Sequence, residues 1–201
     1  MKIPFRKIGD FFIFEKKIIM KKIFTAIAIS LLLTSCSITG LTNDYSKLKE
    51  ADKAKIVALE RFENLDTTKI YKISGKQLRA EVAKHEKSIV YVFKNGCTSD
   101  LCRPMHVYEN YAKQNGYQLF LVMEGYGNLY DTVGQRNNFT SPLFSINTDL
   151  YDSRYRAVYT RMFENELLKK DISYKSKEYL GSLFFFEGNR LDKITMDLPK
   201  Y

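Results

Sequence analysis

Residues 88–102 read Ser-Ile-Val-Tyr-Val-Phe-Lys-Asn-Gly-Cys-Thr-Ser-Asp-Leu-Cys, and this stretch decides the fold. Its first half, 88–94, is nearly all apolar and rich in β-branched and aromatic residues, which is typical of a central strand covered on both faces. Two of the chain's three cysteines, Cys97 and Cys102, follow at once. Open α/β sheets usually place function just past the carboxyl ends of their strands. The cysteine pair therefore marks a candidate functional site.

The segments on either side of this stretch alternate between helix and strand. Ser74-Gly75-Lys76-Gln77 is a capping-box pattern that opens a helix to about Lys87, and a second helix over 103–114 ends at Gly116. Strands are predicted over 69–73, 117–123 and 142–146, followed by a helix from Asp149 or Asp152 and a hairpin of 183–186 with 190–196. This order predicts an α/β fold in which a mixed sheet is flanked by helices.

Two helical patterns complete the expected domain organisation. Residues 44–66 place apolar side chains among many Lys and Glu, which predicts an N-terminal helical extension before a domain over 67–201. Later in the chain, four aromatic residues recur at i+4 spacing and are expected to face the core: Tyr151, Tyr155, Tyr159 and Phe163.

The third cysteine closes an apolar leader. Met20-Lys21-Lys22 supplies positive charge, and residues 23–33 form an uncharged, mostly apolar run of signal-peptide length. The leader ends in Leu33-Thr34-Ser35-Cys36, which is similar to the lipobox of bacterial lipoprotein precursors. We therefore predict a signal peptide over 20–35 and lipidation at Cys36.

This leader predicts where the protein is found. The mature chain would begin at Cys36 and be held to a membrane through lipid, with residues 36–43 as the lipidated cysteine and its tether. The domain and its two remaining thiols would face the periplasm or the cell exterior. The sequence also allows Met20 as the true start, with residues 1–19 as a mis-assigned upstream segment. A short transmembrane anchor or a buried helix is the alternative, but residues 23–33 are too few to span a bilayer as a helix, and the charged flank and small residues fit cleavage better.

Charge argues against a nucleic-acid partner. The chain of 201 residues carries 32 basic and 23 acidic residues, a net charge of +9. Residues 1–35 hold seven of the basic and two of the acidic residues, which leaves 25 against 21, a net of +4, in the mature part. Because much of the basic charge belongs to the leader, binding of nucleic acid is not expected.

Geometry limits how Cys97 and Cys102 can pair. On an ideal helix, residues five positions apart have Cα atoms about 8.6 Å apart, whereas disulfides rarely exceed about 6.8 Å between Cα atoms. A Cys97–Cys102 bond therefore needs Cys97 in the loop, or an unwound first turn. Lys94, three residues upstream, and the start of the following helix would both favour a Cys97 thiolate, whereas Asp100 would oppose it.

Other uses of the pair stay open on these residues. The bond is a structural staple, or the thiols are idle, if the fold has no catalytic role. With His106, the two cysteines also show Cys-x4-Cys-x3-His spacing, which suits copper(I) or zinc. The only other histidine, His85, lies upstream, and no metal or cofactor is assigned.

The element order resembles the thioredoxin-like fold over residues 69–197, with the cysteine motif between the second strand and the following helix. Pro142-Leu143-Phe144-Ser145-Ile146, followed by a helix and a hairpin, looks most like the lipoprotein and TlpA-type branch, whose members handle disulfides outside the cytoplasm. The chain departs from the family motif at four places: Asp100 at the second cysteine position, Gly96 for a tryptophan, Tyr91 for the buried acid, and no proline in 179–183.

A narrower resemblance concerns the loop itself. Gly96-Cys97-Thr98-Ser99-Asp100-Leu101-Cys102 is similar to the Gly-Cys-Thr-x-Glu-x-Cys stretch of bacterioferritin-comigratory-type peroxiredoxins. That resemblance implies a peroxidatic Cys97 and a resolving Cys102. The proline and threonine of the peroxiredoxin signature are replaced by Val90 and Lys94.

Together these patterns predict a membrane-anchored thiol–disulfide oxidoreductase that acts on extracytoplasmic protein or small-molecule thiols. Cys97 would be the attacking thiolate and Cys102 the resolving thiol. The alternatives are a thiol peroxidase that uses the same two residues and a non-catalytic thioredoxin-like lipoprotein that binds a partner.

Overall fold

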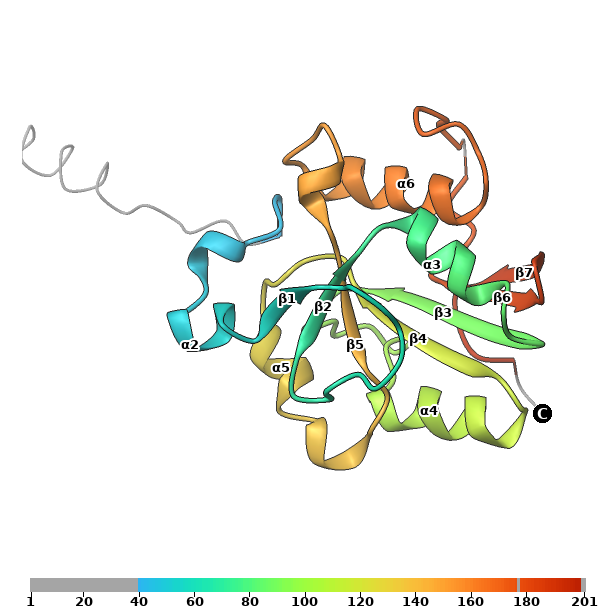
Figure 1. The fold of residues 1–201 in the computed structure, drawn as a ribbon, viewed down its shortest axis with the longest axis horizontal. Coiled ribbons are helices and arrows are strands. Elements are labelled where there is room, and N and C mark those ends of the chain that lie inside the picture. The colour runs from blue at the N-terminus through green and yellow to red at the C-terminus, as the bar shows by residue number, and fades with distance from the viewer. Residues whose placement is uncertain (1–39, 177, 200–201) are drawn as a thin grey trace, which may run out of the picture. The chain divides into compact units, whose positions relative to one another are not determined.

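The computed structural model describes residues 40–176 and 178–199, and its core is a single seven-stranded sheet (Figure 1). The strands are β1 (Ile56–Ala58), β2 (Ile70–Ile73), β3 (Lys87–Phe93), β4 (Gln118–Met123), β5 (Leu143–Ile146), β6 (Leu183–Glu187) and β7 (Arg190–Thr195). The α-helices are α2 (Glu50–Lys53), α3 (Gly75–Val82), α4 (Met105–Gln114), α5 (Leu129–Val133) and α6 (Arg156–Leu167). Three single-turn 3-10 helices accompany them: η1 (Tyr45–Lys47), η2 (Arg136–Asn138) and η3 (Thr148–Leu150).

The sheet is mixed, with β3 inside it. The strand order is β1-β2-β5-β4-β3-β6-β7. The first five strands in this order are parallel, and β6 and β7 are antiparallel to their neighbours. Ile89 of β3 lies opposite Leu119 on one side and Phe185 on the other. The predicted mixed α/β fold with a buried central strand is therefore confirmed.

Alternate residues of β3 serve two cores, one on each face of the sheet. Val90 and Val92 point into the core under α3 and α6, while Ile89, Tyr91 and Phe93 point into the core under α4 and α5. Figure 1 shows the two pairs of helices on opposite faces. Because both faces are covered, the chain just past the end of β3 is a place where polar chemistry can meet solvent.

Local signals placed most elements correctly. The capping box is formed: Ser74 Oγ accepts the Gln77 N–H at 3.1 Å, and Gln77 Oε1 accepts the Ser74 N–H at 3.0 Å. Helix α3 ends at Val82, earlier than the predicted Lys87, because the chain turns there to begin β3 at Lys87 itself. The predicted hairpin is β6 and β7.

Two expectations are corrected. In place of one N-terminal helix over 44–66, the chain forms η1, α2 and then β1, which pairs in parallel with β2 and buries Ile56. Ile56 and Val57 are β-branched and favour a strand, and the helical amphipathic pattern of this segment is weak. The aromatic stripe is also incomplete: α6 begins at Arg156, so Tyr155 precedes the helix and is half exposed, while Tyr159 and Phe163 are fully buried.

The first described residues lie against the domain. The Leu41 carbonyl accepts the Arg156 N–H at 2.8 Å, and the Asn43 carbonyl accepts the Tyr126 N–H at 2.7 Å. Part of the segment predicted as a tether is therefore held by the fold. Cys36, the predicted signal peptide over 20–35 and the upstream segment lie outside the described residues. Within the described ranges, no helix has the length and apolar character that crossing a bilayer requires.

Candidate functional site: a disulfide at the end of the central strand

Cys97 and Cys102 form a disulfide in the loop that joins β3 to α4. Their Cα atoms are 6.0 Å apart, within the usual range for a disulfide. The distance is short because both residues precede α4, which begins only at Met105. The two sulfur-bearing residues differ in exposure: Cys97 is exposed, whereas Cys102 is partly buried. The first of the two arrangements that the spacing allowed, with Cys97 in the loop, is the one found.

Buried polar and glycine contacts hold the chain just before Cys97. Asn95 is buried; its Nδ2 donates to the Gly125 carbonyl at 2.8 Å, and its Oδ1 accepts from Thr132 Oγ1 at 2.6 Å. Gly96 has φ +64°, and an added Cβ would lie 2.5 Å from Asp131 Oδ2. Only glycine combines that conformation with so close an approach. The loop therefore leaves β3 along one path, against the start of α5.

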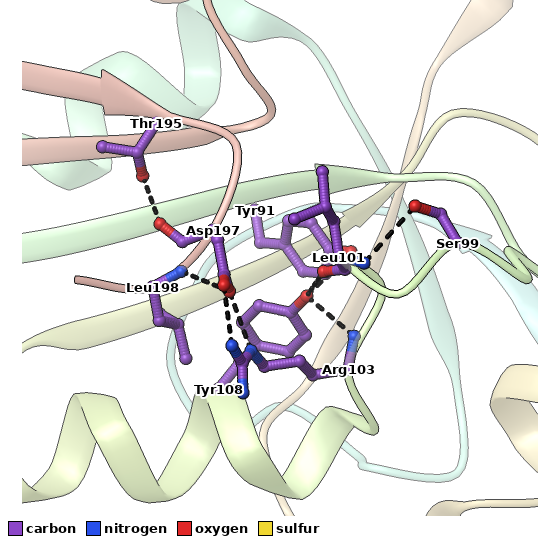
Figure 2. A network of polar contacts seen from close by, with 8 residues as sticks. All are labelled: Tyr91, Ser99, Leu101, Arg103, Tyr108, Thr195, Asp197 and Leu198. Carbon is purple, nitrogen blue, oxygen red and sulfur yellow. Dashed lines mark hydrogen bonds and ion pairs between the residues drawn. The ribbon is translucent and has the colours of Figure 1, made fainter. Parts of the chain in front are cut away.

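A second set of contacts holds the chain around Cys102 (Figure 2). The Tyr108 hydroxyl of α4 accepts the Arg103 N–H at 3.2 Å and lies 3.3 Å from the Leu101 carbonyl and 3.2 Å from the Tyr91 hydroxyl of β3. Figure 2 shows the Tyr91 and Tyr108 rings beside Leu101 and Arg103 of the loop. The two rings stack with centroids 4.2 Å apart.

The Arg103 side chain ties the same residues to the end of the chain. Its Nε and one terminal nitrogen each contact a carboxylate oxygen of Asp197 at 2.7 Å, a forked ion pair. Asp197 also accepts the Leu198 N–H, and its carbonyl accepts from Thr195 Oγ1 (Figure 2). Bidentate arginine–carboxylate pairs are both strong and specific in geometry.

A cavity of about 370 Å³ opens beside the disulfide. Its lining includes both cysteines, the Tyr91 hydroxyl-bearing side chain, two cations and one carboxylate: Lys94, Arg103 and Asp131. The N–H of Met105, at the start of α4, is turned to Gln135 Oε1 at 2.9 Å, and Gln135 lines the same cavity. The surroundings of the pair are thus polar and carry charges of both signs.

Titration behaviour differs between the neighbours of the site. Burial, and then the hydrogen bond with Tyr108, raises the pKa of Tyr91 above its usual range. Tyr91 is therefore a neutral phenol at physiological pH, able to donate a hydrogen bond but not to act as a base. Glu124 follows β4 and donates its N–H to the Phe93 carbonyl at 2.8 Å. Burial raises the pKa of the Glu124 carboxyl, and Arg156, 3.3 Å from that carboxylate, opposes the shift.

The predicted site residues separate into those brought together and those not. Cys97 and Cys102 are joined, and Lys94 lies with them in the cavity. His106 lies on α4 facing a different groove of about 440 Å³, toward Leu198. Among the residues that the structure describes, no group of three or more His, Cys, Asp or Glu side chains is placed to hold a metal ion.

The sequence reasoning missed Tyr108 and Asp197. Their role arises only from tertiary contacts: Asp197 lies 94 residues from Arg103. One sequence signal did point toward Tyr108: Tyr91, whose hydroxyl lies 3.2 Å from that of Tyr108, stands at the strand position where the thioredoxin resemblance expects a buried acid. Gly181, with φ +138°, leads into β6 in the segment where that resemblance expects a proline.

Comparison of the chain with family models, with curated proteins and with solved structures finds no significant match in any of the three. The fold and site themselves define the class: an α/β protein with a mixed sheet, helices on both faces and a cysteine pair at disulfide distance. This arrangement is compatible with a thioredoxin-like fold.

Proposed function

We propose that the protein is a thiol–disulfide oxidoreductase that works through Cys97 and Cys102. The observation that carries the proposal is an accessible disulfide at the carboxyl end of the central strand, whose two halves differ in exposure. A disulfide that served only to stabilise the fold would not need to line a solvent-facing polar cavity, as this one does. Exposed disulfides are the ones that take part in exchange.

The proposed reaction moves two electrons between the protein and a substrate. In the reduced protein, the Cys97 thiolate attacks one sulfur of a substrate disulfide, forms a mixed disulfide and releases the first substrate thiolate. The Cys102 thiolate then attacks the Cys97 sulfur, which restores the Cys97–Cys102 bond and releases the second substrate thiolate. The substrate is reduced and the protein oxidised; the reverse sequence oxidises a substrate dithiol. The exposure of Cys97 and the charge of Lys94 support Cys97 as the first nucleophile.

The order of attack is tested by trapping. With Cys36→Ser as the common background, Cys102→Ser should accumulate a mixed disulfide between Cys97 and an offered protein or glutathione disulfide. Cys97→Ser should accumulate far less. Ser99→Ala, in the same loop, is the matched control and should exchange as the background chain does. Equal trapping by the two cysteine variants would contradict the assigned roles.

The activity itself is tested by redox titration against glutathione, with thiols counted by alkylation and mass. A reversible bond with a potential of roughly −120 to −270 mV lies among known exchange enzymes. A bond below about −300 mV, or one that never forms, would refute exchange and leave a structural or partner-binding role. Peroxide consumption that depends on Cys97 would support the thiol peroxidase instead.

We further propose that Cys36 carries lipid and holds the domain on a membrane, facing the periplasm or cell exterior. The support is the order of charged flank, apolar run and small residues before Cys36. Membrane fractionation and labelling with a fatty-acid analogue test it. Cys36→Ala should lose both the label and the membrane association, and a labelled Cys36→Ala chain would overturn the assignment.

A further inference from the structure

The contacts around the disulfide are uneven, and the unevenness concerns Cys102. On the Cys97 side, residues 97–101 are exposed, and the hydrogen bonds of Ser99 stay inside the loop: its carbonyl accepts the Cys102 N–H at 2.8 Å and its Oγ accepts the Leu101 N–H at 3.3 Å. On the Cys102 side, both neighbours in sequence are fastened to the core. Cys97 is therefore held on its N-terminal side only, through Asn95 and Gly96, whereas Cys102 is held through both of its neighbours.

A single hydroxyl makes the main-chain part of this attachment. Tyr108 is fully buried, and its oxygen accepts the N–H of the residue after Cys102 while lying 3.3 Å from the carbonyl of the residue before it. The Tyr91 hydroxyl at 3.2 Å supplies the second phenol. The Tyr108 hydroxyl thus faces two oxygens to which it can donate, the Leu101 carbonyl and the Tyr91 hydroxyl (Figure 2).

The side-chain part of the attachment comes from the other end of the chain. Arg103 is held through its forked ion pair with Asp197, and Asp197 is fixed in turn by the Leu198 N–H. Leu198 is buried in the core that also contains Tyr91 and Tyr108. Helix α4, strand β3 and the C-terminal segment thus converge on the residues that flank Cys102.

We propose that Tyr108 is a positioning residue for the cysteine pair, and that its hydroxyl sets the equilibrium between the disulfide and the dithiol. The inference rests on the proposed function. In the oxidised protein the bond itself restrains the loop. In the reduced protein the restraint falls to Tyr108, which keeps the Cys102 thiol near the place where it meets Cys97. Without that hydroxyl the reduced loop gains freedom, and forming the bond must remove this freedom again.

The test is the equilibrium in which the dithiol and oxidised glutathione give the protein disulfide and two molecules of reduced glutathione. It uses the full chain with Cys36→Ser, so that only the loop pair reports. Tyr108→Phe should lower the equilibrium constant about tenfold, which equals a potential about 30 mV less negative for a two-electron couple. Tyr91→Phe leaves the contacts of Tyr108 with the loop in place and should change the constant less.

Tyr126→Phe is the matched control, because it also removes a buried phenolic hydroxyl. That hydroxyl forms a hydrogen bond with Ser145 of β5 at 2.8 Å, and Tyr126 does not line the disulfide cavity. It should lose comparable stability to urea and keep the constant of the background chain. If Tyr108→Phe does not fold, Asp197→Ala removes the ion pair to Arg103 instead and should lower the constant in the same direction.

The outcomes separate the two proposals. A background chain that equilibrates with glutathione, with an unchanged constant in Tyr108→Phe, refutes the role of Tyr108 and leaves exchange standing. Equal shifts in Tyr108→Phe and Tyr126→Phe also refute it, since they would reflect general loosening. A background chain whose pair never equilibrates refutes the proposed function and this inference with it.

Discussion

Gly96 gives the sharpest test of how the disulfide loop is held. Its φ of +64° is unfavourable for any residue with a Cβ, and an added Cβ would lie 2.5 Å from Asp131 Oδ2 and 2.9 Å from Asn128 Cβ, an atom attached directly to the backbone. Gly116, after α4, has a similar φ of +70° but no atom within 4 Å of its added Cβ. Replacing either glycine by alanine would therefore incur a similar backbone strain, but only at Gly96 would the added Cβ also clash with neighbouring atoms.

The magnitudes follow from that difference. An L-residue in the left-handed region costs roughly 1–2 kcal/mol, which is the whole expected loss for Gly116→Ala. Gly96→Ala adds contacts about 1 Å inside van der Waals distance, and overpacking of that kind costs about 1–3 kcal/mol more. We therefore expect Gly96→Ala to lose about 2–5 kcal/mol of unfolding free energy.

Urea unfolding of the oxidised proteins measures both values, with the slope m compared between variants so that a change in midpoint reports stability. Counting thiols confirms that Cys97 and Cys102 stay bonded in each sample. Losses for the two variants that agree within about 0.5 kcal/mol, the usual scatter for independent surface changes, would refute the close approach of Gly96 to the start of α5.

Three further variants test other parts of the fold. Burial raises the pKa of Glu109, but hydrogen bonds from the loop before β5 outweigh burial and lower the pKa to about 2. The ionised carboxylate therefore stabilises the fold above its ordinary pKa of 4.5, and this stability is lost as the pH falls toward 2. Glu109→Gln should flatten this acid-dependent loss in urea unfolding measured against pH, and an unchanged loss would contradict the assignment. Burial, with a neighbouring negative charge, raises the pKa of Glu164 to about 7. Because the folded protein then holds a proton that the unfolded chain releases, the free energy of unfolding should fall as the pH rises from 4.5 to 7. Glu164→Gln should remove this dependence on pH, and a dependence that persists in the variant would contradict the assignment. Gly181→Ala would place a Cβ 2.2 Å from the Thr195 carbonyl oxygen and should cost about 2–5 kcal/mol, well above Gly188→Ala, where no atom lies within 4 Å; equal losses would argue against the close approach.

The elements that the sequence predicted well are those whose signal is local. Strand β3 is an apolar run long enough to be a buried strand, and the Ser74 capping box needs only four consecutive residues. The cysteine pair could be assigned to a site because it follows β3 directly. In each case the physics that forms the element acts between residues close in the chain.

The parts that escaped prediction depend on distant partners. Strand β1 has three residues, and its pairing with β2 decides its conformation against a loose helical pattern. Strand β5 lies between β2 and β4, a position that its own residues do not encode. The same holds for the site: Tyr108 and Asp197 reach the residues beside Cys102 only after the sheet and its helices have packed.

Beneath the disulfide loop, β3 contributes the phenol of Tyr91. A buried acid at the position of Tyr91 would titrate and move protons, but burial raises the pKa of Tyr91, so its phenol stays neutral and donates or accepts hydrogen bonds only. Its hydroxyl lies 3.2 Å from that of Tyr108, which in turn contacts the main chain on both sides of Cys102. Tyr91 and Tyr108 therefore act on the geometry of the residues around Cys102, whereas the charged groups beside the cysteine pair are Lys94, Arg103 and Asp131 in the lining of the cavity.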